Sequence, residues 1–444
     1  MPKSLNHPAR LVPIAFLIVI AVGTGLLMLP FARAGGAGGA PFITALFTAT
    51  SAVCVTGLIV QDTATYWSAF GHAVILVLIQ VGGFGIMSGA TLLTMVVARR
   101  LRLSTRLGAQ AETRGLALGD VVTVLRLVAV VALVVQSALA VTLALRLRHG
   151  YGESWANAVW NGMFHAVSAF NNAGFSTYSE GLVRFALDPF VLLPMMLGVV
   201  LGGIGMPVLH DLRRGARQPA RWSLHTKITL LGTALLLPAG LLATLIYEWS
   251  NPATLGGFEP GMRVMHAAFH SVMTRSGGFN AVDVGQMRDQ TLGVTYGLML
   301  IGGGSAGTAG GIKVGTFVIM LLIILAEIRG EPDSVAFGRR VSPEVQRQAV
   351  TIVLLAVAMV GVGTLLLLSI TGMHLRDALF ETISAFATVG LSTGVTPQLP
   401  PSGQALIIVL MFVGRVGTIT VAAALALRAR RNPYRYPEER PIVG

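Results

Sequence analysis

The chain has 444 residues, of which 54% are hydrophobic and only 11% are charged. A soluble domain carries about 25% charged residues, so this composition excludes an ordinary soluble protein and indicates a membrane protein. The net charge of +13 does not indicate a nucleic-acid-binding surface, because most Lys and Arg residues fall in alternate loops between apolar segments, whereas the acidic residues divide about evenly. The single cysteine, Cys54, excludes an intramolecular disulfide and a multi-cysteine metal site.

Eight apolar segments are each long enough to cross a bilayer, for which about 20 residues suffice. They cover residues 11–31, 70–98, 121–146, 186–209, 225–247, 291–326, 349–371 and 403–427. The first has the position of a signal peptide, but it lacks a convincing cleavage site and seven more spans follow, so we interpret it as a span. The excess of Lys and Arg marks the cytoplasmic side. We therefore expect an integral protein of a bacterial cytoplasmic membrane, embedded in the lipid bilayer with both termini in the cytoplasm and with no nucleic-acid partner.

A shorter segment with a helical pattern lies between the two spans of each successive pair. These segments cover residues 41–53, 155–171, 262–274 and 375–387. We interpret them as re-entrant half-helices whose C-terminal ends point into the bilayer, where their partial negative charge favours a cation. Each is followed by a stretch centred on one glycine, namely Gly57, Gly174, Gly278 and Gly390.

These patterns predict an all-α integral membrane protein. Four tandem repeats of span, pore half-helix, filter loop and span, with eight transmembrane helices in all, would surround a central pore. The predicted parts are repeat 1 (1–98), a basic cytoplasmic linker with repeat 2 (99–209), a linker with repeat 3 (210–326), a linker with repeat 4 (327–427), and a basic cytoplasmic tail (428–444).

A second set of glycines keeps these repeats in phase. Clusters at residues 82–85, 202–205, 302–304 and 414–417 lie in the second span of each repeat, at a similar distance after each filter glycine. Glycine-rich packing faces of membrane helices explain any one cluster, but they do not explain the common phase.

The four glycine-centred stretches predict a filter for K⁺. A glycine permits positive φ and lacks a side chain, so neighbouring carbonyls can all face the pore axis. Carbonyl oxygens replace the hydration shell of a hard cation. The predicted filter residues, with K⁺ bound at their carbonyls, are Val55, Thr56, Gly57, Asn172, Ala173, Gly174, Ser276, Gly277, Gly278, Thr388, Val389 and Gly390.

A glycine-rich stretch interrupts the sixth span at residues 302–311. Because each glycine costs about 1 kcal/mol relative to alanine in a helix, we expect an irregular loop inside the membrane. Beneath the filter such a loop would act as a gate, whereas the alternative is a kinked helix–helix contact. The predicted gate residues are Gly302, Gly303, Gly304, Ser305, Gly307, Thr308, Gly310, Gly311, Lys313 and Arg415.

Two of these gate residues are cationic. Arg415 lies in the last span, and a charge there faces the bundle interior or water. It would form an electrostatic barrier in the pore or bind carbonyls of the gate loop. The alternatives are an ion pair, for example with Glu327, or an arginine that reaches the membrane surface. Lys313, near the inner end of its span, would serve the gate or simply extend to the surface.

One alternative belongs to a different functional class. Residues 303–307 match the G-x-S-x-G pattern of hydrolases, with Ser305 as the nucleophile and His165 and His270 as candidate bases. The pattern requires a strand–turn–helix context, whereas both flanks here are predicted membrane helices. We therefore favour a transporter and expect no enzymatic activity.

With these motifs, the chain resembles the Ktr/Trk/HKT superfamily of potassium transporters over residues 11–427. The resemblance rests on the four filter glycines, on residues 310–313 (Gly-Gly-Ile-Lys) and on residues 414–418 (Gly-Arg-Val-Gly-Thr). Eight spans resemble the membrane subunit of Ktr systems most. Phe269 departs from the pattern, because it lies one residue closer to its filter glycine, Gly278, than the corresponding phenylalanine of each other repeat lies to its own. This difference leaves the register of Arg275 and Ser276 open.

The resemblance implies potassium uptake by a homodimer with one gated pore per subunit. It also implies a cytoplasmic ring of nucleotide-binding regulatory subunits of the RCK/KTN type, with the nucleotide on that partner and no cofactor in this chain. Gly57 stands where some sodium-preferring relatives carry serine, so K⁺ is the expected ion. A less selective Na⁺/K⁺ transporter of the same superfamily is the alternative. Co-transport of Na⁺ and stimulation by Na⁺ both stay open.

Overall fold

The computed structural model describes residues 8–36, 38–105 and 120–417. Most of these residues are helical. The helices are α1 (Pro8–Leu27), α2 (Phe42–Val53), α3 (Thr63–Tyr66), α4 (Ala69–Thr105), α5 (Asp120–Tyr151), α6 (Trp155–Phe170), α7 (Pro189–Gly203), α8 (Met206–Gly215), α9 (Leu224–Glu248), α10 (Pro260–Met273), α11 (Asp289–Leu300), α12 (Val314–Ile328), α13 (Pro343–Thr371), α14 (Leu375–Phe386) and α15 (Pro401–Phe412).

Short irregular elements complete the chain. A π-helix (Val413–Gly417) follows α15. Strands β1 (Val335–Ala336) and β2 (Arg339–Arg340) form a small hairpin in the described part of the chain. Single 3₁₀ turns lie at Pro30–Ala32, Ala34–Gly36, Val183–Phe185, Pro219–Arg221, Val284–Gln286 and Thr396–Gln398. The hairpin lies in the predicted linker before repeat 4, so this linker contains a short β-structure. The predicted tail 428–444 and most of the linker at 99–120 lie outside the described residues.

Within the described residues, four helices are long and apolar enough to cross a membrane: α9, α13, Ala69–Gly89 in α4 and Leu125–Tyr151 in α5. The predicted span 186–209 is not one straight helix, because α7 and α8 meet at an angle of 97°. Three of the shorter apolar helices, α1, α12 and α15 with the π-helix, lie in the other predicted spans, and α11 precedes α12 within the span 291–326.

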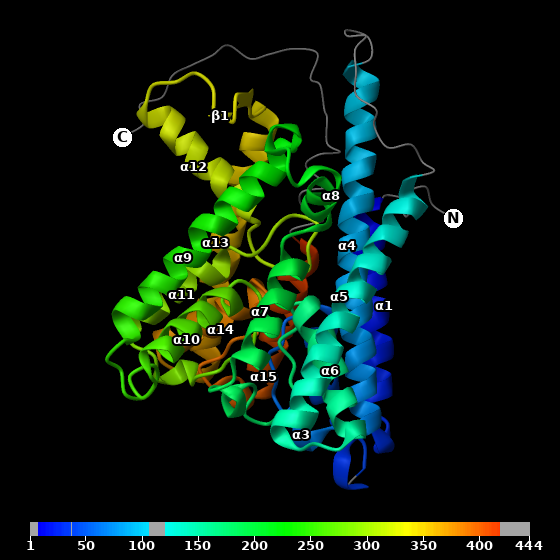
Figure 1. The fold of residues 1–444 in the computed structure, drawn as a ribbon. Helices are drawn as coiled ribbons and strands as arrows, with labels where there is room; N and C mark the ends of the chain where they lie inside the picture. Colours follow the sequence, from blue (N-terminus) through cyan, green and yellow to red (C-terminus); the bar gives the residue numbers. More distant parts are fainter. Residues whose placement is uncertain (1–7, 37, 106–119, 418–444) are drawn as a thin grey trace.

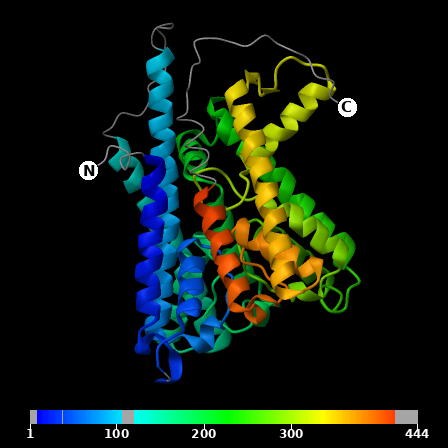
Figure 2. The ribbon, with the colours of Figure 1, turned by 180° about the vertical axis from the view of Figure 1, so that it is seen from behind.

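Short helices fill the space between the long ones. In Figure 1, α1, α4 and α5 run along one flank, α9 and α11 lie along the other with α10 below them, and α6, α7 and α14 lie between the flanks. Figure 2, from behind, shows α13 and α15 in yellow to red on the remaining side. Helices α2, α6, α10 and α14 have 12 to 16 residues, or about 18–24 Å, which is shorter than the ~30 Å core of a bilayer.

The helices contact one another in a closed cycle. Each short helix packs on the long helix before it: α2 on α1, α6 on α5, α10 on α9 and α14 on α13. The helix after each short helix also packs on the next short helix along the chain, through the pairs α4–α6, α7–α10 and α11–α14. The pair α15–α2 joins the last segment to the first and closes the cycle.

Local sequence explains where several helices begin. Ser154 caps α6 by accepting from the Asn157 amide at 3.3 Å, and Ser223 caps α9 by accepting from the Thr226 amide at 3.2 Å. Helices α7, α10, α13 and α15 begin with proline, whose fixed φ suits the first helical position.

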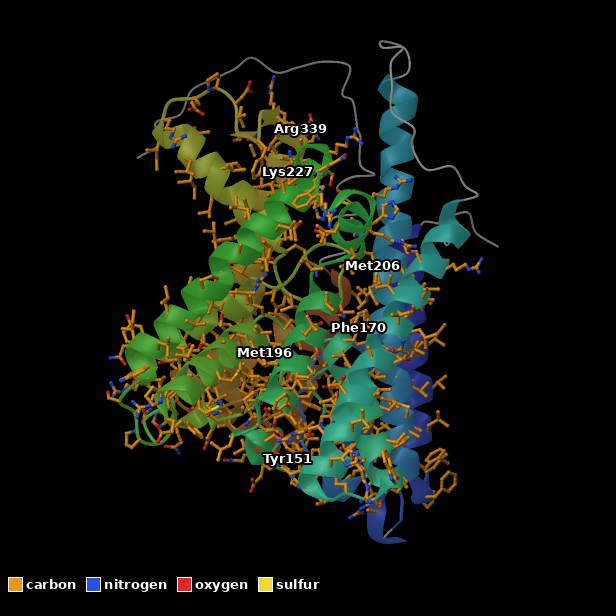
Figure 3. All side chains as sticks on the ribbon, viewed as in Figure 1. Tyr151, Phe170, Met196, Met206, Lys227 and Arg339 are labelled. Atoms are coloured by element: carbon orange, nitrogen blue, oxygen red, sulfur yellow. The ribbon has the colours of Figure 1, made fainter. Side chains whose placement is uncertain are left out.

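Charge distinguishes the two ends of the bundle. Figure 3 shows Lys227 and Arg339 at one end and Tyr151 at the other, with Phe170 and Met206 between them. Arg213 and Arg214 end α8, and Arg340 belongs to the hairpin at the same basic end. The end with Lys227 is therefore the one that the distribution of positive charge predicts to be cytoplasmic.

Candidate functional site

The four predicted filter glycines lie against one another in a closed ring. A Cβ atom added to Gly57 would lie 3.0 Å from the Cα atom of Gly174. One added to Gly174 would lie 3.0 Å from the Cα atom of Gly278, and one added to Gly278 would lie 3.4 Å from that of Gly390. A Cβ atom added to Gly390 would overlap the carbonyl oxygen of Thr56. Four segments far apart in the sequence thus meet at one place that has no room for a methyl group.

The same backbone conformation recurs in the four filter loops (residues 54–57, 171–174, 275–278 and 387–390). Each filter glycine has a φ between 71° and 93°. The residue two positions earlier also has a positive φ, although it is not glycine: Val55 (55°), Asn172 (60°), Ser276 (71°) and Thr388 (48°). Such values cost a non-glycine residue about 1–3 kcal/mol, so the surrounding structure must hold them in place.

The glycines of the second helices have a specific partner. In three repeats, a Cβ atom at the helix glycine would overlap the last carbonyl oxygen of the preceding short helix, in the pairs Gly82–Val53, Gly202–Phe170 and Gly414–Phe386. In the third repeat, a Cβ atom at Gly302 would instead overlap the carbonyl of Gly310. In three repeats, the common phase seen in the sequence therefore has a structural reason, because the second helix must approach the end of its short helix closely.

Buried serines brace three filter loops from within. Ser384 Oγ accepts from the Gly390 amide at 3.1 Å and donates to the Leu391 carbonyl at 2.6 Å. The equivalent serines also bond to their own loops, namely Ser51 and Ser168. The third repeat has Val272 at this position. Its filter loop must therefore be braced in another way.

The third filter loop has the same register as the others. Ser276 lies two residues before Gly278 and has the positive φ of its counterparts. Helix α10 ends at Met273, one residue earlier relative to its glycine than the other short helices. Arg275 is therefore the counterpart of Cys54, Asn171 and Ala387.

A cavity of about 560 Å³ opens on the outer side of the glycine ring. The four filter glycines and the loops that follow them line it. Its lining includes the carboxylates Asp62, Glu180 and Asp283 and contains no Lys or Arg. Such a cavity raises the local concentration of cations.

The gate loop (residues 302–311) separates α11 from α12. Its ends are joined where the Gly302 amide donates to the Ile312 carbonyl and the Ile312 amide donates to the Leu300 carbonyl, each at 2.9 Å. Both Ala306 and Gly311 have positive φ. The stretch is thus an irregular loop, as its glycine content predicts.

The bend between α7 and α8 holds one side of the gate loop. The Gly304 amide donates to the Gly203 carbonyl at 2.8 Å, and the Thr308 amide donates to the Gly202 carbonyl at 3.1 Å. These carbonyls end α7, so they lack helical partners. Gly205, with a φ of 98°, makes the turn that allows this contact. Sequence reasoning missed this bend, although the glycines at 202–205 were its signal.

The gate loop also contacts the filter loops directly. Thr308 Oγ1 donates to Asn172 Oδ1 at 2.7 Å, and the Gly310 amide donates to Ser276 Oγ at 3.0 Å. Ser276 Oγ in turn donates to the Thr388 carbonyl at 2.7 Å. All these residues are buried. Direct hydrogen bonds therefore join the gate loop to the second and third filter loops, and the third filter loop to the fourth.

Arg275 was singled out in the sequence only for its uncertain register, yet it anchors the gate loop. Its Nη2 donates to the Gly302 carbonyl at 3.1 Å, and the residue is 7% exposed. The signal available in the sequence was a cation three residues before a filter glycine in an apolar setting. Arg275 and Ser276, neighbours in the chain, thus bond to opposite ends of the gate loop.

The two cations predicted to serve the gate differ in their contacts. Arg415 is 3% exposed, and its guanidinium nitrogens have no hydrogen-bond partner among the described residues. Neither a pair with Glu327 nor a bond to the gate loop is formed within that part of the chain. Lys313 donates to the Ala309 carbonyl, so its side chain folds back on the gate loop. Cys54 and Lys313 both lie within electrostatic range of Arg415.

The proposed hydrolase residues are not brought together. His165 bonds to Asn161 and Ser176, and His270 lies 3.1 Å from the Thr295 hydroxyl. In the described part of the chain, no hydrogen bond joins Ser305 to either histidine.

Comparison with known proteins gives a consistent result. Residues 10–431 match the family model TrkH, described as "Cation transport protein". The chain is 37% identical to the Ktr system potassium uptake protein B of Bacillus subtilis, with 98% of this chain and 97% of the relative covered. It is 35% identical to the potassium/sodium uptake protein NtpJ of Enterococcus hirae, with 98% and 97% covered.

A solved structure has a similar fold. The crystal structure of the potassium transporter TrkH from Vibrio parahaemolyticus superposes with a TM-score of 0.70 at 18% identity. The match covers 92% of this chain and 84% of that chain. At this identity the likeness concerns the fold.

Proposed function

The chain belongs to the TrkH family of cation transport proteins, and we propose that it takes up K⁺ through a carbonyl-lined filter closed from the cytoplasmic side by the gate loop. The family assignment confirms the resemblance that the sequence motifs indicated. It also identifies a membrane-embedded ion transporter and not an enzyme. The hydrolase hypothesis for Ser305 is therefore wrong.

The observation that carries this proposal is the ring of four glycine loops with matching backbones. Positive φ at each glycine and at the residue two positions before it supports a common orientation of the intervening carbonyls. The short helices α2, α6, α10 and α14 end at these loops, so the partial negative charge of their C-termini favours a cation there. A strained arrangement repeated four times is best explained by a task that the four loops share.

We further propose that four repeats with eight spans surround this pore. The closed cycle of helix contacts supports a fourfold arrangement. In this reading the pairs α7–α8 and α11–α12 are broken spans whose irregular backbone lines the pore, the setting in which such backbone is tolerated at membrane depth.

The gate is proposed on two observations. The gate loop bonds to the filter loops at Asn172 and Ser276, so it would obstruct an ion leaving the filter. The buried charge of Arg415, without a hydrogen-bond partner in the described residues, would add an electrostatic barrier.

A second candidate function is transport of both K⁺ and Na⁺. It is favoured by the similarity to the potassium/sodium uptake protein of Enterococcus hirae. Glycines at all four ring positions support K⁺ as the preferred ion.

The proposed assembly follows from the relatives. The relatives named as members of a Ktr system support a partner subunit, which we propose is a cytoplasmic nucleotide-binding ring on a homodimer of this chain. The basic end of the bundle, with Lys227 and Arg339, would face that ring and the cytoplasm.

Flux into liposomes tests the function. The purified chain would be exposed to K⁺, Rb⁺, Na⁺ or Li⁺ under an inward-negative potential, which contributes about 2.3 kcal/mol per charge per 100 mV. Selective uptake of K⁺ and Rb⁺ is the expected result. Measuring whether Na⁺ enters the liposomes together with K⁺ distinguishes coupling from stimulation. Equal fluxes of K⁺ and Na⁺ would favour the second candidate. Absence of flux in a variant with a shortened gate loop, correctly folded, would refute both.

A further inference from the structure

Ser276 occupies a position between the filter and the gate. Its hydroxyl donates to the Thr388 carbonyl at 2.7 Å and accepts from the Gly310 amide at 3.0 Å. Thr388 belongs to the filter loop of repeat 4, whereas Gly310 belongs to the gate loop. One fully buried side chain thus links two elements that must behave differently when an ion passes.

Ser384 provides a contrast within the same molecule. Its hydroxyl also accepts from an amide and donates to a carbonyl, but these groups belong to Gly390 of its own filter loop and to Leu391 directly after it. Ser384 therefore braces one loop, while Ser276 connects the third loop, the fourth loop and the gate. Asn172, the counterpart of Ser276 in repeat 2, bonds to the gate through Thr308 but donates to no filter carbonyl in the described residues.

The arrangement makes the two hydrogen bonds of Ser276 interdependent. An O–H group that donates to a carbonyl becomes a better acceptor, so the bond to Gly310 strengthens when the bond to Thr388 forms. A cation at the Thr388 carbonyl withdraws electron density from that oxygen and repels the hydroxyl proton, so it weakens the bond from Ser276. Occupation of the filter there therefore weakens the hold on Gly310, and release of Gly310 weakens the Ser276–Thr388 bond and so favours the cation.

We propose that Ser276 is a positioning residue that couples K⁺ binding at the Thr388 carbonyl to opening of the gate loop. The inference rests on the proposed function, because it requires a K⁺ site at that carbonyl. By linkage, K⁺ loosens the gate loop by the same factor by which an open gate strengthens K⁺ binding.

Amide hydrogen exchange of the gate loop tests the coupling without relying on flux. The full chain in lipid nanodiscs would be compared in saturating K⁺ and in N-methylglucamine of equal ionic strength. We expect K⁺ to speed exchange of residues 302–311 by a factor of about 2–10, the range that loss of one typical hydrogen bond produces. Exchange in α13 should stay the same.

Substitutions separate coupling from anchoring. Ser276→Gly should speed loop exchange even without K⁺ and abolish the K⁺ dependence, and the φ of 71° at this position suits glycine. Ser276→Ala should give the same result. Thr308→Val removes the hydroxyl that bonds to Asn172 and to the Phe170 carbonyl, so it should speed exchange but keep the K⁺ dependence. Ser369→Ala, which removes an exposed hydroxyl bonded only to the Leu365 carbonyl within α13, should alter neither the basal exchange of the gate loop nor its K⁺ dependence.

Two results would overturn the inference. One is K⁺-independent loop exchange in a wild-type protein that shows K⁺-selective flux. The other is K⁺ dependence retained in both Ser276 variants. A wild type and a loop-shortened variant that both lack cation-selective flux would instead refute the proposed function, so the two failures are distinguishable.

Discussion

Gly390→Ser offers the most direct test of the glycine ring, because the chain contains a matched control. Gly390 and Gly394 have the same φ of 92°. A Cβ atom at Gly390 would overlap the Thr56 carbonyl oxygen and lie 3.2 Å from the Cα atom of Gly278, whereas one at Gly394 would meet nothing within 4 Å. The two substitutions therefore share their backbone strain, about 1–2 kcal/mol, and differ in contact with the ring.

The extra effect at Gly390 should appear in ion selectivity. To accommodate a side chain, the Thr56 carbonyl must move, and selectivity depends on the carbonyls that replace the hydration shell. A change of about 1.4 kcal/mol in the preference between two ions is a factor of ten. We expect Gly390→Ser to lower the K⁺/Na⁺ flux ratio about tenfold and Gly394→Ser to change it less than about twofold.

Flux ratios in liposomes would be measured for both variants, together with thermal unfolding in detergent to compare their stability. Similar stability with a loss of selectivity in Gly390→Ser alone would support the ring. An unchanged flux ratio in both variants would contradict the reasoning. So would an equal loss in both, because the ring contact would then have no effect beyond backbone strain.

Two further predictions concern charge along the pore. Arg415→Ala should raise flux in the resting state about tenfold, equivalent to about 1.4 kcal/mol, because it removes a buried charge without a hydrogen-bond partner in the described residues. Arg415→Lys keeps the charge, so its flux should stay near that of the wild type. Reduced flux in a well-folded Arg415→Ala protein would count against an electrostatic barrier. Glu180→Gln, in the exposed lining of the outer cavity, should lower uptake at low K⁺ and about 10 mM ionic strength but not at about 150 mM, where the screening length falls to about 8 Å. A loss of equal size at both ionic strengths would show that Glu180 does not act through long-range attraction.

Repeated features of the sequence predicted much of the fold. The half-helices expected at 41–53, 155–171, 262–274 and 375–387 correspond closely to α2, α6, α10 and α14. Their boundaries could be predicted because length, amphipathic pattern and a following glycine recur together. The interruption of the sixth predicted span was also predictable, since a glycine-rich stretch does not sustain a helix.

Contacts between repeats were not predictable in the same way. The 97° bend between α7 and α8 depends on a gate loop that is about a hundred residues distant in sequence. The apolar span 186–209 gives no sign that the carbonyls of Gly202 and Gly203 accept from the amides of Thr308 and Gly304. The same holds for Arg275, whose partner is a backbone carbonyl, because backbone groups carry no sequence signal.

The sequence could suggest partners for Arg415 but could not decide among them. Glu327 is a plausible partner for a charge at membrane depth, yet the two form no ion pair within the described part of the chain. Whether a buried charge meets an acid, a carbonyl or water depends on the packing of several helices. The assignments of individual residues to filter and gate therefore stay predictions for the experiments above.

Because one chain closes the cycle of helix contacts, the four quadrants of the ring can evolve separately. The position three residues before the filter glycine holds four different residues: Cys54, Asn171, Arg275 and Ala387. An assembly of four identical subunits would have to place the same residue in every quadrant, so an anchoring arginine would bring four charges together instead of one. A single chain thus permits an asymmetric ring with one anchoring arginine, and a mutation at this position changes only one quarter of the ring.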